Sequence, residues 1–399
     1  MNALPILLLL AQSFEQRGFI ENRTLIYPQE AANDPAEIVS QGQVRWDVAY
    51  RSAPWLKWNA SLDALADTHR QTNRDARINL DDRAIRRPAL SLRQWSASLS
   101  QGKLTAVIGR QIIRWGKTDI LTPTDRFAPR DYLGNVVDSD FLPVIATRVT
   151  AASAGDSLDL IWQPWFTPSR TPLLDQRWTV LPTNNFQLID GGARYPGRSQ
   201  FGARWNHLGG GREYSLSYFD GFNHLPLFTV RPDTSTPALV FERIYPTMRM
   251  VGGDAAIQFP WLTIKGEAGY FMTRTTGAQD YVLYVIQLER QVKEWSFVGG
   301  YAGEVVRGEV NNTPRFTPDR GFAKSFVARA ALTIDANRSL AMETAVRAGG
   351  SFTRFEYVQA FGSHWRVTPG VAWIRGDASD FLGQYRRNSY LSLALRYSF

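Results

Sequence analysis

Residues 388–399, at the end of the chain, read NSYLSLALRYSF. From Leu391 onward every second side chain is apolar or aromatic, and the side chains between them are small or polar. This period of two predicts a β-strand with one apolar face and one polar face. The strand stops on an aromatic residue, Phe399. Two structures fit such an ending: an ordinary strand of a soluble β-sandwich, or the last strand of a closed barrel, which pairs with the first.

The same alternation recurs along the whole chain. In one of the clearest stretches, Val44 and Trp46 share one face while Arg45 and Asp47 share the other. The pattern predicts an all-β fold of about eighteen strands, with sixteen as the alternative count. The expected strands cover residues 18–27, 43–51, 56–69, 90–100, 104–115, 145–152, 158–163, 201–207, 214–220, 251–259, 262–274, 281–292, 295–306, 326–334, 340–347, 352–361, 364–377 and 388–399.

Short and long connections alternate between these strands. Tight turns such as residues 101–103 and 293–294 are followed by long polar connections such as residues 116–143 and 164–198. The exception is the compact stretch 348–351, where an even strand count requires a hairpin. This arrangement is typical of an up-and-down transmembrane antiparallel β-barrel, with both termini on the short-turn, periplasmic side. A stack of soluble sandwich domains would also alternate, but it has less need for tryptophan and tyrosine near its strand ends.

The composition limits the other classes. The 399 residues contain no linker or charge block that would divide them into domains, so we expect one barrel domain over residues 14–399. There is no cysteine, which excludes disulfides, thiolate metal sites and a cysteine nucleophile. The formal net charge is +8, but acidic and basic residues are interspersed, so the sequence does not favour nucleic-acid binding.

The N-terminus reads MNALPILLLLAQS, and residues 1–13 predict the end of a secretory signal peptide. No lysine or arginine precedes the apolar run, which suggests either a truncated signal whose true start lies upstream or a signal that relies on the charge of its α-amino group. The run is too short to span a bilayer, and the chain has no other apolar stretch of sufficient length. The sequence therefore predicts a protein of the outer membrane of a Gram-negative bacterium, without transmembrane helices.

The polar faces of the strands predict the lining of the lumen. The expected pore-lining residues are Arg45, Asp47, Arg51, Lys57, Asp63, Arg110, Arg114, Arg148, Asp159, Arg204, Lys265, Glu267, Arg329 and Glu343. We expect residues 116–143 to fold inward as a constriction near Arg110 and Arg114. Strict alternation places Ile112 on the same face, so this stretch needs a bulge or a partly apolar wall. Alternatively, the two arginines are structural residues that pair with acids on neighbouring strands.

Two stretches carry a family resemblance. Residues 109–116 read GRQIIRWG and residues 122–125 read TPTD. This resembles a motif of a family of Gram-negative outer-membrane barrels of unknown function (domain-of-unknown-function family 1302), related to alginate-export and porin-type barrels. The chain departs from the family pattern at Thr122, before the proline. The final strand also resembles the assembly signal of such barrels, with Leu393, Leu395, Tyr397 and Phe399 as the residues read by the barrel-assembly machinery.

The resemblance implies a location and a fold, with transport as the default role and no catalytic residues. The four histidines, His69, His207, His224 and His364, have no metal-ligand spacing, and no nucleophile or phosphate-binding motif has a credible setting. We therefore expect no cofactor and no metal. The preferred hypothesis is a porin-like channel or export barrel for small polar or weakly anionic solutes.

Other roles stay open at this point. One is a plugged barrel that serves an export system or has a structural role, and an outer-membrane hydrolase is less favoured. The expected partners are outer-membrane lipid and lipopolysaccharide, the barrel-assembly machinery, and a periplasmic or inner-membrane transport protein.

Overall fold

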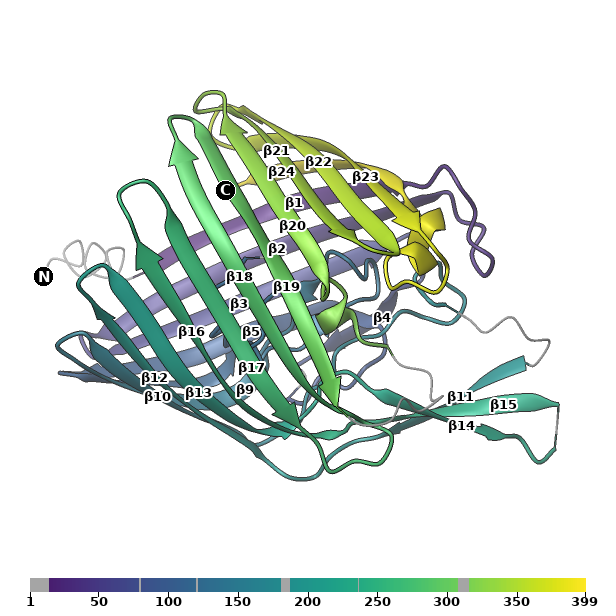
Figure 1. Ribbon diagram of the computed structural model, residues 1–399, viewed down its shortest axis with the longest axis horizontal. Coiled ribbons are helices and arrows are strands. Elements are labelled where there is room, and N and C mark those ends of the chain that lie inside the picture. The colour runs from purple at the N-terminus through teal and green to yellow at the C-terminus, as the bar shows by residue number, and fades with distance from the viewer. Residues whose placement is uncertain (1–13, 79, 120, 181–186, 236, 308–315) are drawn as a thin grey trace, which may run out of the picture.

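The computed structural model describes residues 14–399 except for 79, 120, 181–186, 236 and 308–315. The expected signal segment 1–13 lies outside the described residues. The main sheet has 19 strands, of which 18 close into an antiparallel barrel and one, β4, is an addition. Figure 1 shows the strands running obliquely around the barrel. The fold class and the preferred strand count are therefore confirmed.

The barrel strands follow one another around the wall in chain order. Their bounds are β1 (Phe14–Ile26), β2 (Ile38–Ala53), β3 (Leu56–Asp67), β5 (Arg87–Gln101), β6 (Leu104–Gln111), β9 (Val144–Ser153), β10 (Asp156–Gln163), β12 (Gln200–Gly209), β13 (Arg212–Phe222), β16 (Thr247–Gln258), β17 (Thr263–Met272), β18 (Asp280–Val292), β19 (Trp295–Arg307), β20 (Ser325–Thr333), β21 (Arg338–Arg347), β22 (Gly350–Phe361), β23 (Trp365–Gly376) and β24 (Tyr390–Ser398). Each predicted strand has a counterpart among them, including the hairpin between β21 and β22.

The first and last strands close the barrel. β1 pairs with β24 from Phe19 opposite Ser398 to Ile26 opposite Leu391. Beyond this ladder, the Gly18 N–H donates to the Phe399 carbonyl at 2.8 Å, and the Phe399 N–H donates back at 3.0 Å. A Cβ on residue 18 would lie 2.6 Å from the Phe399 ring, so only glycine allows this contact. The chain-terminal aromatic therefore completes the seam.

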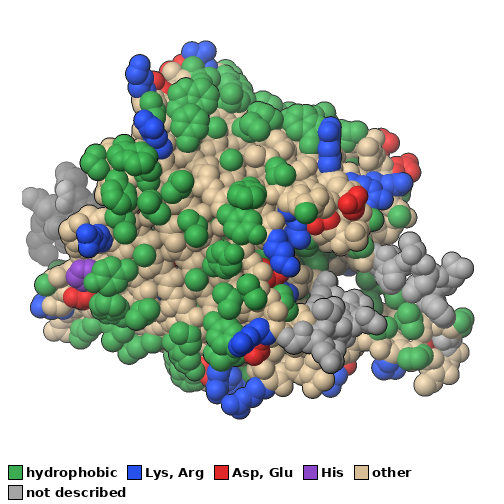
Figure 2. Space-filling model, in the orientation of Figure 1, with side chains coloured by type: hydrophobic (Ala, Val, Ile, Leu, Met, Phe, Trp, Pro, Cys, Tyr) green, Lys and Arg blue, Asp and Glu red, His purple; other side chains and the backbone are tan. Residues whose placement is uncertain are grey.

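The outer wall carries large apolar side chains at alternate positions. Leu160, Leu216 and Leu393 are 50%, 64% and 49% exposed, whereas the inward Asp63 is 5% exposed. In the space-filling view, apolar side chains cover the wall and charged ones gather toward its two ends (Figure 2). Such an apolar band is the surface that a transmembrane barrel presents to lipid. No helix among the described residues is long and apolar enough to cross a membrane.

The expected assembly residues lie on or beside this band. Leu395 and Phe399 are 43% and 51% exposed, and the Tyr397 ring packs 5.0 Å from the Trp365 ring. The start of β1 lies opposite the end of β2, which leads into a two-residue turn. Both ends of the described chain therefore lie at the short-turn end of the barrel.

Three features of the structure differ from the sequence prediction. β6 ends at Gln111, four residues before the predicted strand end, and the chain then turns into the lumen; Gly109, within the strand, has a φ of +131°. β4 (Thr72–Arg77) then pairs in parallel with β5 and extends the sheet beside this departure. The long connections hold further strands, namely β7 (Arg130–Asp131), β8 (Asp140–Phe141), β11 (Gln187–Arg194), β14 (Leu227–Pro232) and β15 (Ala238–Ile244), and the 3-10 helices η1 (Pro318–Arg320) and η2 (Gly383–Asn388). β11, β15 and β14 form a small sheet that projects from the long-loop end (Figure 1).

The two faces of the wall predict different responses to a new charge. Leu216→Arg places a guanidinium in the apolar band and should destabilise the barrel by about 2–4 kcal/mol. Ala341→Arg places the same group on the lumen face, opposite Glu356, and should change stability little. Urea unfolding of both variants in lipid vesicles measures the difference. Equal losses of stability would contradict the assignment of the faces.

Candidate channel constriction

After β6 the chain enters the barrel as an inward segment, residues 112–143. Its apolar side chains are buried, with Ile113 1%, Trp115 3% and Phe127 1% exposed. The Asp125 carboxylate shapes the entry, because it accepts the backbone N–H groups of Trp115 at 2.5 Å and Gly116 at 2.7 Å. A Cβ on residue 116 would come within 2.5 Å of the Thr122 side chain, so this turn requires glycine. Residues 109–116 and 122–125, which carry the family resemblance, thus form the bend into the lumen.

The Glu267 carboxylate on β17 holds the inward segment against the far wall. One oxygen accepts the Thr124 N–H at 2.7 Å and the Thr124 hydroxyl at 2.8 Å. The other accepts the backbone N–H groups of Lys117 and Thr118, at 2.8 and 3.1 Å, and the Thr118 hydroxyl at 2.9 Å. Glu267 is 3% exposed. This predicted lumen residue is therefore a buried anchor that satisfies five donors of the segment.

The other side of the segment reaches β22 and β24. Asp138 forms an ion pair with Arg354 of β22 at 2.7 Å, and Arg354 also contacts Glu343 of β21 at 3.0 Å. The Asn135 amide donates to the Tyr390 hydroxyl at 3.2 Å. Because β17 and β22 lie in different parts of the barrel circumference, the inward segment crosses the lumen.

A cavity of about 330 Å³ lies between the inward segment and the wall. Its lining includes Arg114, Arg126, Arg130 and Arg354, together with Asp119, Asp125, Asp138, Asp319 and Glu343. The Phe141 ring lies at the centre of the basic part, with the Arg114 and Arg130 guanidinium carbons 4.3 and 4.0 Å from its centroid. This cation–π packing orients two arginines along one side of the cavity.

The other predicted lumen residues form ion pairs on the inner wall. Arg45 pairs with Asp63 at 2.7 Å, and Arg93 approaches the same carboxylate at 3.5 Å. The remaining pairs are Arg17–Asp47, Lys57–Glu15, Arg148–Asp159, Arg204–Asp254, Lys265–Glu289 and Arg354–Glu343. Arg329 lies opposite Glu343 in the register, and Arg51 lies opposite Lys57. Most of these charges are thus balanced across neighbouring strands.

The structure places Arg110 away from the cavity. Arg110 is 4% exposed and contacts Asp82 at 2.7 Å. Arg170 bridges Asp82 and Asp131, at 2.8 and 3.1 Å, and Arg87 contacts Asp131 at 2.8 Å. Burial alone would raise the pKa of Asp131, but the two arginines and the Leu133 N–H lower it to about 2. Arg110 therefore belongs to a buried network of ion pairs with residues of the long connections, while Arg114 lines the cavity.

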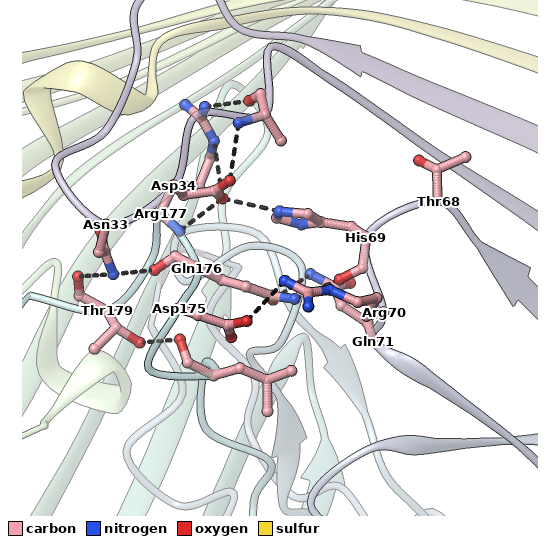
Figure 3. Close-up of polar contacts among 12 residues, drawn as sticks. Asn33, Asp34, Thr68, His69, Arg70, Gln71, Asp175, Gln176, Arg177 and Thr179 are labelled. Atoms are coloured by element: carbon pink, nitrogen blue, oxygen red, sulfur yellow. Dashed lines mark hydrogen bonds and ion pairs between the residues drawn. The ribbon is translucent and has the colours of Figure 1, made fainter. Parts of the chain in front are cut away.

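Residues 173–179, here called the mouth strap, lie against residues 33–34 and 69–71 of the connections after β1 and β3 (Figure 3). The Asn33 amide donates to the carbonyls of residues 174 and 176 at 2.8 and 2.7 Å. The Asp34 carboxylate accepts the Arg177 N–H at 3.0 Å and lies 2.9 Å from the His69 ring nitrogen. The Asn388 amide, from the connection before β24, donates to the Arg177 carbonyl at 2.9 Å.

An apolar cluster lies beneath the mouth strap. It contains Trp178 from the strap, Tyr132 and Val136 from the inward segment, and Phe352 from β22. These side chains are 1–3% exposed. The strap, its partners and this cluster form a cover over the mouth of the barrel.

Sequence reasoning missed Arg130, Phe141 and Asp138, which lie in a connection without alternation, and it missed the mouth strap entirely. The alternation gave no signal for them, although the three prolines and the charges of residues 116–143 marked that stretch as unusual. Among the described residues no cluster of histidine and acidic side chains could hold a metal ion. His224 lies buried between the carbonyls of Thr167 and Arg126.

Comparison with known proteins supports the geometry at the level of the fold. No family model matches the chain, and no curated protein sequence matches it. Among solved structures, a BenF-like porin from Pseudomonas fluorescens Pf-5 superimposes with a TM-score of 0.58 at 10% identity, covering 97% of this chain and 98% of the porin. The fold is that of an outer-membrane porin.

Two further structures agree with this porin fold. OccAB4 of Acinetobacter baumannii has a TM-score of 0.60 at 9% identity, and OpdQ of Pseudomonas aeruginosa has 0.54 at 12% identity. In both cases the match covers 97% of this chain and 98% of the other. The porin-type barrel and its outward apolar band indicate a location in the outer membrane.

The Glu267 anchor predicts the local stability of the inward segment. Glu267→Gln removes the charge and places an amide beside the donors of the segment. This should lower the free energy of local unfolding of the segment by about 2–3 kcal/mol. Hydrogen exchange at the N–H groups of Thr118 and Thr124 should accelerate roughly 30- to 150-fold. Glu21→Gln is the control, because Glu21 pairs with Arg396 and does not touch the segment. Unchanged exchange in Glu267→Gln would show that the segment is held elsewhere.

The ion-pair chain at Asp131 predicts an acid-sensitive contribution to stability. The pKa of this carboxyl is lowered from about 3.9 in an unfolded chain to about 2. Its contribution, about 2–3 kcal/mol, is present above pH 4 and is lost as the pH falls toward 2. Asp131→Asn should flatten the pH dependence of urea unfolding in this window. Glu30→Gln, at an exposed position, should leave the slope intact, and an identical slope in Asp131→Asn would refute the assignment.

Proposed function

We propose that this protein is a passive channel for small polar or weakly anionic solutes. The observation that carries the proposal is the cavity of about 330 Å³ between the inward segment and the wall, lined by charged groups. Narrowing of a water-filled barrel by an inward segment confines solutes beside fixed charges, which gives selectivity without covalent chemistry. The porin fold supports the same role. Catalysis is not part of the proposal.

The charges around the cavity favour weak selectivity. Four arginines and five carboxylates line it, and most of them form ion pairs with one another, so no strong field of one sign develops. Asp125 is already occupied by two backbone N–H groups and by Arg114. The Arg114 side chain is 48% exposed, and with Arg130 it forms a basic side on which a carboxylate or phosphate group of a solute can rest. We infer a modest preference for anions and zwitterions.

Further parts of the proposal concern the setting of the barrel. Both termini are assigned to the periplasm, because the long connections of outer-membrane barrels lie outside the cell. Membership of the family of unknown function 1302 rests on residues 109–116 and 122–125, which form the bend into the lumen. Lipid and lipopolysaccharide, the barrel-assembly machinery and a periplasmic or inner-membrane transport protein are the proposed partners. No role in nucleic-acid binding is proposed.

A plugged barrel is the second candidate, and the mouth strap favours it. The strap and the apolar cluster beneath it cover the long-loop end. Conductance in planar bilayers separates the two candidates. A steady current through the wild-type barrel supports the channel. A silent wild type that conducts after Asn33→Ala and Asn388→Ala, which release the strap, supports the plug.

The basic side of the cavity predicts the ion preference of the channel. Arg114→Glu with Arg130→Glu should shift the reversal potential in a salt gradient toward cations. The permeability ratio should change roughly severalfold at about 0.01 M salt, where the Debye length is about 30 Å, and less at physiological salt. Arg17→Glu with Arg51→Glu is the control. It changes the net charge by the same amount, but at the short-turn rim, and should change the reversal potential little. An unchanged reversal potential with intact conductance would remove the basis for anion preference.

A further inference from the structure

A groove of about 550 Å³ lies on the outer wall at the long-loop end of β23 and β24. The part of the groove nearer the middle of the barrel is apolar and belongs to the lipid-facing band. Trp373 and Leu391 lie there and are 42% and 48% exposed. The other part of the groove is basic and contains Arg375, Arg386 and Arg387, all exposed. The groove therefore joins an apolar surface to a cationic one at the level where the membrane-facing band ends.

The fold fixes these three arginines on the outside. Arg375 follows Trp373 by two residues on β23, so both side chains point away from the lumen. Arg386 and Arg387 belong to η2, which is held down by Leu382 and Tyr385, at 0% and 3% exposure. Because Leu382 and Tyr385 are buried in the barrel mouth, Arg386 and Arg387 face outward.

The three arginines lack acidic partners. None of them forms an ion pair within the part of the chain that the structure describes, and the single side-chain hydrogen bond among them runs from Arg386 to the Gly383 carbonyl. The nearby Asp380 is occupied by Arg347 at 2.7 Å, and Asp377 is an exposed acid two residues after Arg375.

A second outward basic pair at the same end of the wall provides the contrast. Arg198 and Arg249 share the Asp220 carboxylate, at 2.6 and 2.8 Å. Both side chains are 49% exposed. Exposure is thus common to the two sites, but only the groove on β23 and β24 presents a cationic surface without a partner.

We propose that this groove binds the phosphorylated headgroup of an acylated sugar lipid, lipid A of the outer leaflet. Guanidinium groups bind phosphate oxygens through paired hydrogen bonds. Three unpaired arginines fit the two phosphates of lipid A better than the single phosphate of a glycerophospholipid. Acyl chains would lie along Trp373 and Leu391, on the band that already faces lipid. The assignment rests on the proposed orientation, with the long connections outside the cell.

Titration of the purified barrel in detergent tests the site directly. Bis-phosphorylated lipid A should bind the wild type, and Arg375→Gln with Arg386→Gln and Arg387→Gln should weaken binding on the order of 100-fold. Arg198→Gln with Arg249→Gln is the matched control and should bind as the wild type does. Native mass spectrometry or fluorescence of labelled lipid A gives the affinities. Binding does not depend on conductance, so its failure is distinguishable from failure of the channel proposal.

Three outcomes would overturn the proposal. One is equal binding by the triple variant and the control. Another is phosphatidylglycerol binding as tightly as lipid A, which would show general attraction of anionic lipid. The third is displacement of lipid A by millimolar inorganic phosphate, which would show a site for free phosphate. If the triple variant fails to assemble, Arg386→Gln with Arg387→Gln changes only the connection outside the barrel and should still weaken binding on the order of 25-fold.

Discussion

The rule that governs this structure is that no backbone polar group can be left without a partner in hydrocarbon. A sheet meets it only by closing on itself, so the last strand must pair with the first. The reciprocal bonds between Gly18 and Phe399 finish that closure at the chain end. Once the cylinder is closed, alternation divides every strand into a lipid face and a lumen face. The apolar band and the ion pairs of the inner wall both follow.

The inward segment meets the same requirement by other means. Having left the wall at Gln111, it needs partners for its N–H groups, and Glu267 satisfies three of them together with two hydroxyls. A buried carboxylate is stable only when its oxygens are satisfied in this way. Segment and anchor therefore depend on each other: without the segment Glu267 would be an unpaired lumen charge, and without Glu267 the segment would lose its position.

The sequence could predict the wall because the wall obeys a period of two. Val44 and Arg45 reveal their faces from adjacent positions alone, and the same alternation marks the other barrel strands except at local irregularities such as those after Arg51 and at Gly109. The constriction has no such period. Glu267 and Thr118 meet across 149 positions of chain, and Gly109 has a positive φ that alternation does not encode. Counting places Arg110 on the lumen side, but it cannot show that Arg110 contacts Asp82, which lies in a separate connection. The strap was unpredictable for the same reason, since its partners come from separate connections.

The inward segment and the mouth strap are both held by buried polar groups. The inward segment is fixed by a 3% exposed carboxylate with charge-assisted bonds, which water does not reach and salt does not screen. The mouth strap is held by amide side chains that donate to backbone carbonyls and by Arg177, which lies 3.7 Å from the Asp34 carboxylate with both side chains at most 3% exposed. Its other ion pair, between Arg70 and Asp175, is 74% and 53% exposed. Exposed pairs of this kind contribute little, at most about 1 kcal/mol. The exposed pair therefore adds little to the hold on the strap, which depends, as the inward segment does, on polar groups that water does not reach.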